Sequence, residues 1–406
     1  MSERLPDRQS LGDQQERPQG STADLGVYIH WPYCARICPY CDFNVVRDRG
    51  RTQEQADLAA AILADLEAQR VLTGPRRLVS IFFGGGTPSL MDPQAAADMI
   101  AAARRLWDAA PDLEISLEAN PTDAETGRFA ALANAGVNRL SLGVQALDDA
   151  SLAFLGRNHD VGAARRAATE AARLFPRLSL DLIYARPGQT PDAWAEELRT
   201  AIGWGAEHLS PYQLTIESGT AFDRAVRRGA FRPADEVLGA ALYDTTQSVL
   251  EAQGFDAYEV SNHAKGPAAR SRHNLVYWSG QDYVGVGPGA HGRLTLDGRR
   301  TATGAHRAIG AYIAAVRDTG LGFAEREALS PVEAAEERLL MGLRIDAGVG
   351  FDELAPLGLT AGHPEVVALA ADGLLRPDHQ RLRATRRGRL VLDWITGRLA
   401  IAANPA

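Results

Sequence analysis

Short apolar, β-rich runs alternate with amphipathic stretches over residues 25–216. The stretches between the runs, such as QADLAAAILADLEAQRVL, PQAAADMIAAARRLW and PDAWAEELRTAIGW, carry apolar residues at three- and four-residue spacing, which is typical of helices packed on one face. Six strand–helix units in series predict an α/β fold, with a parallel, barrel-like sheet and helices outside it. The runs predicted as strands are LGVYIHW (25–31), LVSIFFGGG (78–86), LEISLEANP (113–121), NRLSLGVQ (138–145), LSLDLIY (178–184) and HLSPYQLTI (208–216).

The pattern changes after residue 216. We expect a long helix near residues 234–252 and a glycine-rich stretch, DYVGVGPGAHGRL at 282–294, that extends or covers the open side of the sheet. From about Ser330 a helical pattern precedes a small hairpin and a final helix, which predicts a smaller, mainly helical, winged-helix-like domain. The expected division is a disordered polar tail at 1–22, a barrel domain at 23–260, an extension at 261–329 and a C-terminal domain at 330–406.

Composition and charge narrow the function classes. The chain of 406 residues is 45% hydrophobic and 23% charged, as expected of a globular protein with one large core. Its net charge of -8 argues against a dedicated nucleic-acid binder. Charged or polar residues interrupt every long apolar run, and the first twenty residues lack the hydrophobic core of a signal peptide. The sequence therefore favours a cytoplasmic location.

All three cysteines of the chain lie in one short stretch, YIHWPYCARICPYCDF at residues 28–43. An odd, closely spaced set excludes a disulfide framework. A CxxC redox pair would use Cys38 and Cys41 but has no need of Cys34, and a structural zinc site would need a fourth ligand, for which His30 is the nearby candidate. A [4Fe-4S] cluster on three thiolates keeps one iron open for another ligand. The motif alone favours the cluster over zinc and leaves both open.

Other unusual residues follow the predicted strands. The cysteine stretch follows the first strand and GGGTPS follows the second; Glu118 and Asn120 end the third, Gln145 ends the fourth, and Asp181 lies within the fifth. Barrels built from strand–helix units carry their chemistry at the carboxyl ends of the strands. Each residue alone is more often an ordinary strand-end or surface residue, so it is their shared placement that predicts a site.

Several motifs occur in an order that resembles a known family. The spacing of Cys34, Cys38 and Cys41 is the CxxxCxxC of the radical S-adenosylmethionine (SAM) superfamily. Within it, the chain resembles the oxygen-independent coproporphyrinogen III oxidase family over nearly its full length, through YIHWPYCARICPYCDF, FFGGGTPSL, LEANP, GVQALDDASLAFLGRNHD, DLIYARPGQT and YEVSNHA. The resemblance implies a partial (β/α)6 barrel, a [4Fe-4S] cluster on the three cysteines, and SAM chelated by the open iron.

The resemblance also assigns residues to the SAM site. The glycines of GGGTPS would let the backbone approach the methionine amine, because they carry no side chain, although a tight turn would use glycine as well. Aromatic rings beside the cysteines would shield the cluster or stack on adenine, unless they are core aromatics. The SAM-contacting residues that the resemblance implies are Tyr28, Tyr40, Gly85, Gly86, Thr87, Glu118, Gln145, Arg157, Asp181, Thr215 and His291.

Two motifs separate the branches of this family. Decarboxylating members resemble CxxxCxxCxC, whereas this chain has Phe43 at the position of the last cysteine. Phe43 and the motif HNLVYW at 273–278 resemble the heme-chaperone branch, the HemW type, and the long N-terminal extension of the decarboxylating branch is missing. The resemblance therefore implies a heme carrier and assigns no catalytic residue. The alternative is an enzyme that oxidatively decarboxylates coproporphyrinogen III, and a radical enzyme that modifies nucleic acid is a more distant one.

The heme-chaperone resemblance implies partners and a heme contact. The partners are heme, a recipient hemoprotein of respiration, an electron donor for the cluster, and a membrane touched only through the recipient. Histidine is a known heme-iron ligand, and HNLVYW offers His273, with Tyr277 and Trp278 to pack on the porphyrin. The plainer interpretation is a strand entering the core, with His273 bonded in a turn. Because His263 and His291 are competing imidazoles, only the resemblance favours His273.

Two arginine features stay open at this point. Arg186 stands where the family usually has a GLPGQT-like turn, beside the strand that faces SAM. Five arginines near the C-terminus could meet heme propionates or a nucleic acid, but such a group is more often a solvated hairpin face. They are Arg381, Arg383, Arg386, Arg387 and Arg389.

Overall fold

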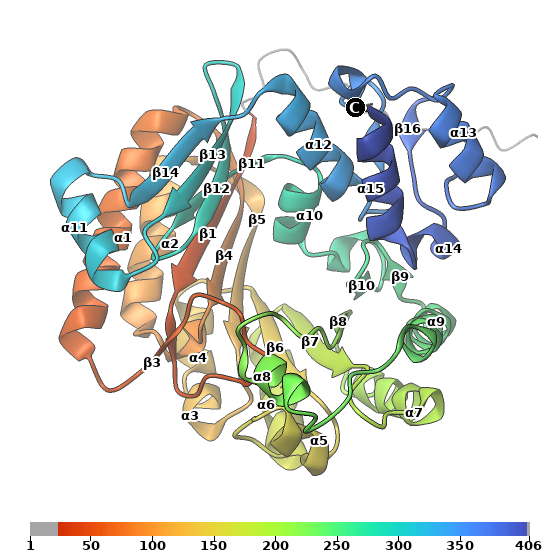
Figure 1. Ribbon diagram of the computed structural model, residues 1–406. Helices are drawn as coiled ribbons and strands as arrows, with labels where there is room; N and C mark the ends of the chain where they lie inside the picture. The colour runs from red at the N-terminus through yellow and green to blue at the C-terminus, as the bar shows by residue number, and fades with distance from the viewer. Residues whose placement is uncertain (1–22, 404–406) are drawn as a thin grey trace, which may run out of the picture.

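The computed structural model describes residues 23–403, so the tail expected at residues 1–22 lies outside the described part. Its central feature is a twelve-stranded sheet (Figure 1). Seven adjacent strands of this sheet run parallel to one another: β11 (Asp282–Val286), β1 (Asp24–Trp31), β4 (Arg77–Gly85), β5 (Asp108–Ala119), β6 (Arg139–Gln145), β7 (Arg177–Tyr184) and β8 (His208–Gln213). The six predicted strands are confirmed, and β11 adds a seventh beside β1.

Antiparallel strands complete both edges of the sheet. Beyond β11 lie β12 (His291–Leu296), β13 (Arg299–Ala305) and β14 (Phe323–Ala328). Beyond β8 lie the two-residue strands β10 (His263–Ala264) and β9 (Asp256–Ala257). The glycine-rich segment thus continues the barrel sheet, as expected. Its role in the fold is to give β1, which precedes the cysteines, a partner strand on each side.

The strands are buried on both faces because helices cover the outer face. In β1 the side chains of Leu25, Val27 and Ile29 are fully buried, and the same core contains apolar residues of the surrounding helices. The expected helices at 55–72, 93–107, 191–204 and 234–252 are confirmed. The long helices of this layer are α1 (Thr52–Thr73), α2 (Pro93–Leu106), α6 (Val161–Leu174), α7 (Pro191–Ile202), α9 (Glu236–Ala252) and α11 (Ile309–Thr319).

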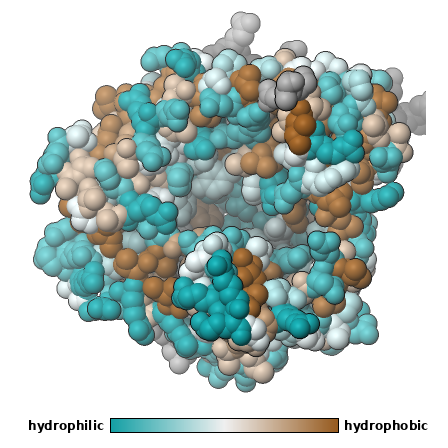
Figure 2. Space-filling model, in the orientation of Figure 1, coloured by the Kyte–Doolittle hydropathy of each residue, from teal (hydrophilic) through white to brown (hydrophobic). Residues whose placement is uncertain are grey.

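Shorter elements line the ends of the sheet. Three-residue 3-10 turns occur at Pro88–Leu90, Pro267–Ala269 and Ala355–Leu357. The short elements before residue 280 are β2 (Tyr33–Cys34), β3 (Val46–Arg47), α3 (Asp123–Thr126), α4 (Phe129–Asn134), α5 (Asp149–Phe154), α8 (Ala221–Arg227) and α10 (Arg272–Trp278). Figure 2 shows this face of the molecule hollowed near its middle, with polar and apolar residues around the opening.

The C-terminal region has its own small core and is mainly helical, as expected. Ser330 begins its first helix with a capping box, in which Glu333 is the partner residue. A bridge between Leu375 and Ala384 forms the expected hairpin. Figure 1 shows α12 beside α10 and α15 beside α12, to one side of the sheet. The elements are α12 (Pro331–Gly342), β15 (Val349–Gly350), α13 (Pro364–Ala371), β16 (Arg381–Leu382), α14 (Arg386–Arg389) and α15 (Leu392–Ala403).

Two local expectations differ from the structure. HNLVYW forms helix α10 rather than a strand, because the Ser271 side chain caps its N-terminus by accepting from the Asn274 amide. The sixth predicted strand ends at Gln213 instead of Ile216, which leaves Thr215 in the following loop. Between residues 23 and 403, no helix is both long and apolar enough to cross a bilayer.

Candidate functional site

The loop after β1 carries the three cysteines to the carboxyl end of the sheet. Cys34 is buried, Cys38 and Cys41 are half-buried, and none of them is in a disulfide. All three line one cavity of about 400 Å³, called here the cysteine cavity. Burial raises the pKa of the Cys34 thiol to about 12. Three thiols on one loop around one cavity suit a cluster whose irons each take one thiolate.

The zinc alternative loses its fourth ligand in this structure. His30 is 5% exposed, its Nδ1 lies 2.9 Å from the Tyr28 hydroxyl, and its Nε2 lies 2.9 Å from the carbonyl oxygen of Asn44. Among residues 23–403, no three His, Cys, Asp or Glu side chains converge on a position for a single metal ion. With both ring nitrogens of His30 in hydrogen-bonding distance of protein oxygens, the three thiols lack the fourth ligand that a tetrahedral zinc site needs.

The glycine turn after β4 forms another wall of the cysteine cavity. Gly85 has a φ of 107°, which side chains rarely adopt, and a Cβ there would lie 2.5 Å from the His30 ring. A Cβ on Gly86 would lie 2.6 Å from the Tyr33 carbonyl oxygen. Only glycine fits at these two positions because a Cβ would clash with neighbouring protein atoms, and both residues line the cysteine cavity.

Two carboxyl groups face each other across the same cavity. Burial, and then the charge of Asp181, raise the pKa of Glu118 to about 8. Burial also raises the pKa of Asp181, which accepts from the Ser141 hydroxyl at 2.8 Å. Glu118 accepts from the Gly85 amide at 3.1 Å. Two half-buried carboxyl groups that line one cavity favour a cation between or beside them, such as the ammonium of an amino acid.

Arg157 connects the cysteine loop with the strand ends. Its Nη1 donates to Cys38 Sγ at 3.3 Å and its Nη2 donates to the Gly143 carbonyl oxygen at 3.1 Å and to Asn120 Oδ1. Gln145 follows at a bulge of β6, with a left-handed φ of 70°. Left-handed backbone at a non-glycine residue carries strain that functional sites often hold. Both side chains line the cysteine cavity.

The structure thus brings together most of the residues expected at the cofactor site. Each of these side chains or backbones lines the cysteine cavity: Cys34, Cys38, Cys41, Tyr40, Gly85, Gly86, Thr87, Glu118, Gln145, Arg157, Asp181 and Thr215. Three expected residues, Tyr28, His291 and His273, do not line it. Tyr28 and His291 line a neighbouring cavity of about 800 Å³, called here the histidine cavity. It shares Asp42, Phe43, Gly85 and Glu118 with the first.

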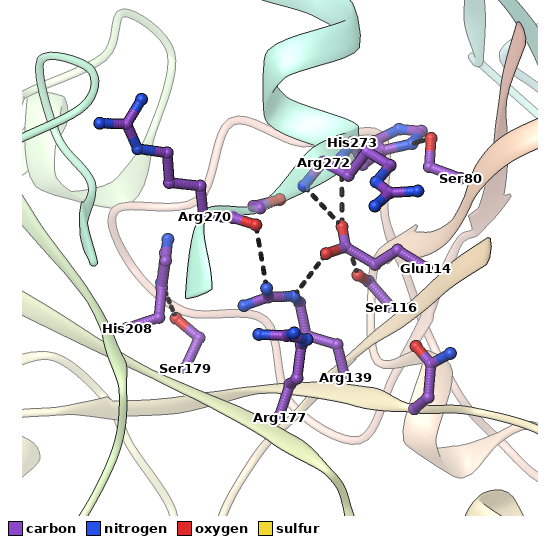
Figure 3. A network of polar contacts seen from close by, with 12 residues as sticks. Ser80, Glu114, Ser116, Arg139, Arg177, Ser179, His208, Arg270, Arg272 and His273 are labelled. Carbon is purple, nitrogen blue, oxygen red and sulfur yellow. Dashed lines mark hydrogen bonds and ion pairs between the residues drawn. The ribbon is translucent and has the colours of Figure 1, made fainter. Parts of the chain in front are cut away.

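His273 lies behind both cavities in a buried polar network (Figure 3). Its Nδ1 lies 2.8 Å from the Ser80 hydroxyl and its Nε2 lies 2.7 Å from the Tyr277 hydroxyl. Glu114 accepts from the backbone amides of Arg272 and His273, at 2.9 and 3.1 Å. This carboxylate therefore anchors the first turn of α10 to the barrel strand β5, and its charge favours the helix N-terminus.

A buried arginine completes that network. Arg139 Nε donates to Glu114 Oε2 at 2.9 Å, and its Nη2 donates to the carbonyl oxygens of Ala269 and Arg270 (Figure 3). The side chains of Arg139 and Glu114 are only 2% and 7% exposed. Sequence reasoning missed this pair. Its one signal is a charged residue early in each of two apolar strands, Glu114 in LEISLEANP and Arg139 in NRLSLGVQ.

The structure shows the contacts of Arg186 and of two arginines in the C-terminal group. Arg186 is buried and pairs with Glu197, with Nη1 donating to Oε1 at 3.0 Å, and it does not line the cysteine cavity. In the C-terminal group, Arg381 donates to the carbonyl oxygens of Ala347 and Gly348. Arg386 pairs with Glu251 at 3.4 Å. These contacts tie β16 and α14 to their surroundings.

Family models match two parts of the chain. Residues 28–201 match the radical SAM superfamily, and residues 329–391 match the HemN C-terminal domain. These ranges contain the cysteine cavity's main strands and the C-terminal helices, respectively.

Whole-chain relatives agree with these matches. The chain is 40% identical to the "Radical S-adenosyl methionine domain-containing protein 1, mitochondrial" of Bos taurus, over 96% of this chain and 90% of that protein. It is 37% identical to "Heme chaperone HemW" of Mycobacterium tuberculosis, over 91% and 93%. Among solved structures, the coproporphyrinogen III oxidase HemN of Escherichia coli, described as a radical SAM enzyme, superposes with a TM-score of 0.75 at 19% identity, over 95% of this chain and 91% of that one.

Proposed function

Because this chain belongs to the radical SAM proteins of the heme chaperone HemW family, we propose that it binds heme and delivers it to a hemoprotein. Membership of the radical SAM family implies a [4Fe-4S] cluster and SAM. In this proposal Cys34, Cys38 and Cys41 hold the cluster, and the remaining residues of the cysteine cavity hold SAM. When bound, the cluster and SAM supply one-electron chemistry.

Phe43 is the observation that favours a carrier over the decarboxylating enzyme. Its side chain is 61% exposed and lines both cavities. A phenyl ring can neither bind iron nor transfer a proton, so a thiol function at this position is not available to the protein. It can instead cover an apolar ligand. Decarboxylation of coproporphyrinogen III is therefore the second candidate.

Each residue of the SAM site has a proposed task. Glu118 and Asp181 attract the ammonium of SAM, and the bare backbone at Gly85 and Gly86 lets the methionine part approach the cysteines. Arg157 holds Cys38 in position. The loop that carries the three cysteines, together with Tyr40, excludes water from the cluster.

The remaining partners follow from the same proposal. The protein works in the cytoplasm, receives electrons for its cluster from a separate donor, and meets a membrane only through a membrane-bound respiratory recipient. It acts on no nucleic acid. His273 contributes to heme binding through Tyr277, whose hydroxyl it holds.

The test is an anaerobic reconstitution followed by two assays. We expect about four irons per chain, saturable heme binding, transfer of heme to an apo-hemoprotein, and no conversion of coproporphyrinogen III with SAM and a reductant. Phe43→Cys is the matched variant, since it asks whether a thiol alone restores turnover. Protoporphyrinogen IX formation by the unchanged protein would instead support the enzyme, and stoichiometric zinc without iron would contradict the cluster.

A further inference from the structure

We infer that heme lies in the histidine cavity and that its iron takes an axial imidazole from His291 or His306 rather than from His273. The inference rests on the proposed function, since it names where the carried heme is held. Its support comes from the shape of the cavity, the register of two strands, and the bonding of every histidine in the described barrel.

The histidine cavity has a size and lining suited to a flat aromatic ligand. Its volume is about 800 Å³, within the range of roughly 300–1,000 Å³ that small-molecule sites occupy. Tyr28, Phe43, Tyr277 and Tyr283 supply aromatic surface. Such rings can pack on a porphyrin face. Arg307, at the same cavity, offers a cation for a propionate.

Two imidazoles reach this cavity from neighbouring strands. His291 begins β12 and pairs in register with Gly304 of β13, while His306 follows two residues after Gly304. β13 ends at Ala305, so His306 lies just beyond the strand, and both histidines line the histidine cavity. A Cβ at Gly304 would lie 3.9 Å from Cε1 of His291. The glycine therefore leaves room beside the ring.

The rings of His291 and His306 are free to bind a metal. Neither has a hydrogen-bond partner among residues 23–403, and His291 is exposed while His306 is half-buried. A neutral imidazole with a free nitrogen is the form that ligates heme iron.

The other histidines of the barrel are unsuitable as ligands. Four are at most 5% exposed, and in three of these both ring nitrogens lie within hydrogen-bonding distance of a protein oxygen: His30, His208 and His273. In His263, the fourth, Nε2 lies 3.3 Å from Gln247 Oε1 and Nδ1 has no partner, but the residue is only 1% exposed and lines neither cavity. His159 is half-buried against the Val144 carbonyl oxygen. For His273, iron ligation would require loss of the bond to Ser80 at Nδ1 or of the bond to Tyr277 at Nε2.

Heme titration of suitable variants tests the assignment. The unchanged protein should show the absorption and resonance Raman signature of histidine-ligated heme. His291→Ala with His306→Ala should lose that signature and weaken heme binding by at least about tenfold, the lower end of losses seen when a metal site is disturbed. Free imidazole should restore the signature. The two single variants identify the ring that binds iron, and His379→Ala, which alters an exposed C-terminal histidine, is the control.

A second comparison separates ligation from positioning. His273→Ala and Tyr277→Phe both break the hydrogen bond between these two residues, so both should lower heme affinity and keep the imidazole signature. His273→Ala also loses the bond to Ser80 and should have the larger effect. The ligand assignment is overturned if the double variant keeps the unchanged spectrum and affinity, or if His273→Ala alone abolishes the signature while Tyr277→Phe leaves it. Absence of heme binding by the unchanged protein would overturn the proposed function itself. Iron content and SAM binding, measured in parallel, should stay unchanged in every variant.

Discussion

At the residue scale, Glu118 has an unusual titration. Its pKa of about 8 in the folded protein, against an ordinary 4.5, results mainly from burial and then from Asp181. Between these two values the native chain keeps a proton that the unfolded chain releases. Stability of the cofactor-free protein must therefore fall as the pH rises through this window, because the unfolded state binds fewer protons.

Glu118→Gln keeps the shape of the neutral side chain and removes the titration. We expect the Tm of the cofactor-free variant to be close to that of the unchanged protein near pH 5 and clearly higher near pH 8.5, because only the carboxyl form acquires a buried charge. Calorimetry across this pH range gives the difference. Glu196→Gln, at an exposed residue, serves as control and should show no such trend. A constant difference at all pH values would mean that Glu118 ionises normally.

Several residues of the candidate site could be placed from the sequence, and the reason is local. The carboxyl ends of consecutive parallel strands meet at one edge of the sheet. The sequence therefore predicts that Glu118, Gln145 and Asp181 lie close to the cysteines. The bonding of His273 could not be predicted in the same way, since Ser80 lies 193 residues away in the chain. Neither could the two positive φ angles at Gln145 and Gly85, which depend on a bulge and on the packing of His30.

At the element scale, α10 depends on charges that come from the barrel. The helix has only seven residues, too few for independent stability in water. The Glu114 carboxylate holds its first turn, and Arg139 holds both that carboxylate and the two residues before the Ser271 cap. This explains why the strand expected for HNLVYW is not formed. The segment is helical because of its N-terminal anchors.

Breaking the anchor should therefore affect both stability and the heme site. Removing one member of a buried ion pair typically costs about 3–5 kcal/mol, because the other charge stays buried without a partner. We expect Glu114→Gln to lower stability toward urea by an amount of this order and to loosen Tyr277. Glu114→Gln with Arg139→Met should recover part of the loss. Equal stabilities for all three proteins in urea titrations would show that the pair does not anchor α10.

At the scale of the whole molecule, the sheet joins segments that a division at residue 260 would separate. The sequence correctly predicted six parallel strands from their periodicity. It could not reveal that β11 lies beside β1, because the order of strands depends on packing between residues more than 250 positions apart. Without β11, one edge of β1 and its apolar side chains would be exposed to solvent.

Two fragments test whether the barrel needs β11 to fold. Residues 1–260 should be largely insoluble, because they leave one edge of β1 and its apolar side chains uncovered. Residues 1–329 keep β11 to β14, and we expect this fragment to be soluble and to bind iron, with a lower Tm because it loses contacts such as that of Arg338 with the Trp278 carbonyl oxygen. Soluble yield, iron per chain and thermal unfolding measure the difference. A soluble, iron-loaded 1–260 fragment would contradict the expectation.

Asn44, at the end of the cysteine loop, makes the closure of that loop depend on residues that are synthesised much later. Its Nδ2 donates to the carbonyl oxygens of Pro288 and Arg307 at 2.9 Å, and the second of these partners comes 263 residues later in the chain. At common rates of synthesis of about 5–20 residues per second, the nascent chain exposes its three cysteines for roughly 13 to 53 seconds before their loop can close. Cluster assembly machinery that acts only on a closed loop would have to wait until after translation. The cysteines must be kept reduced until then.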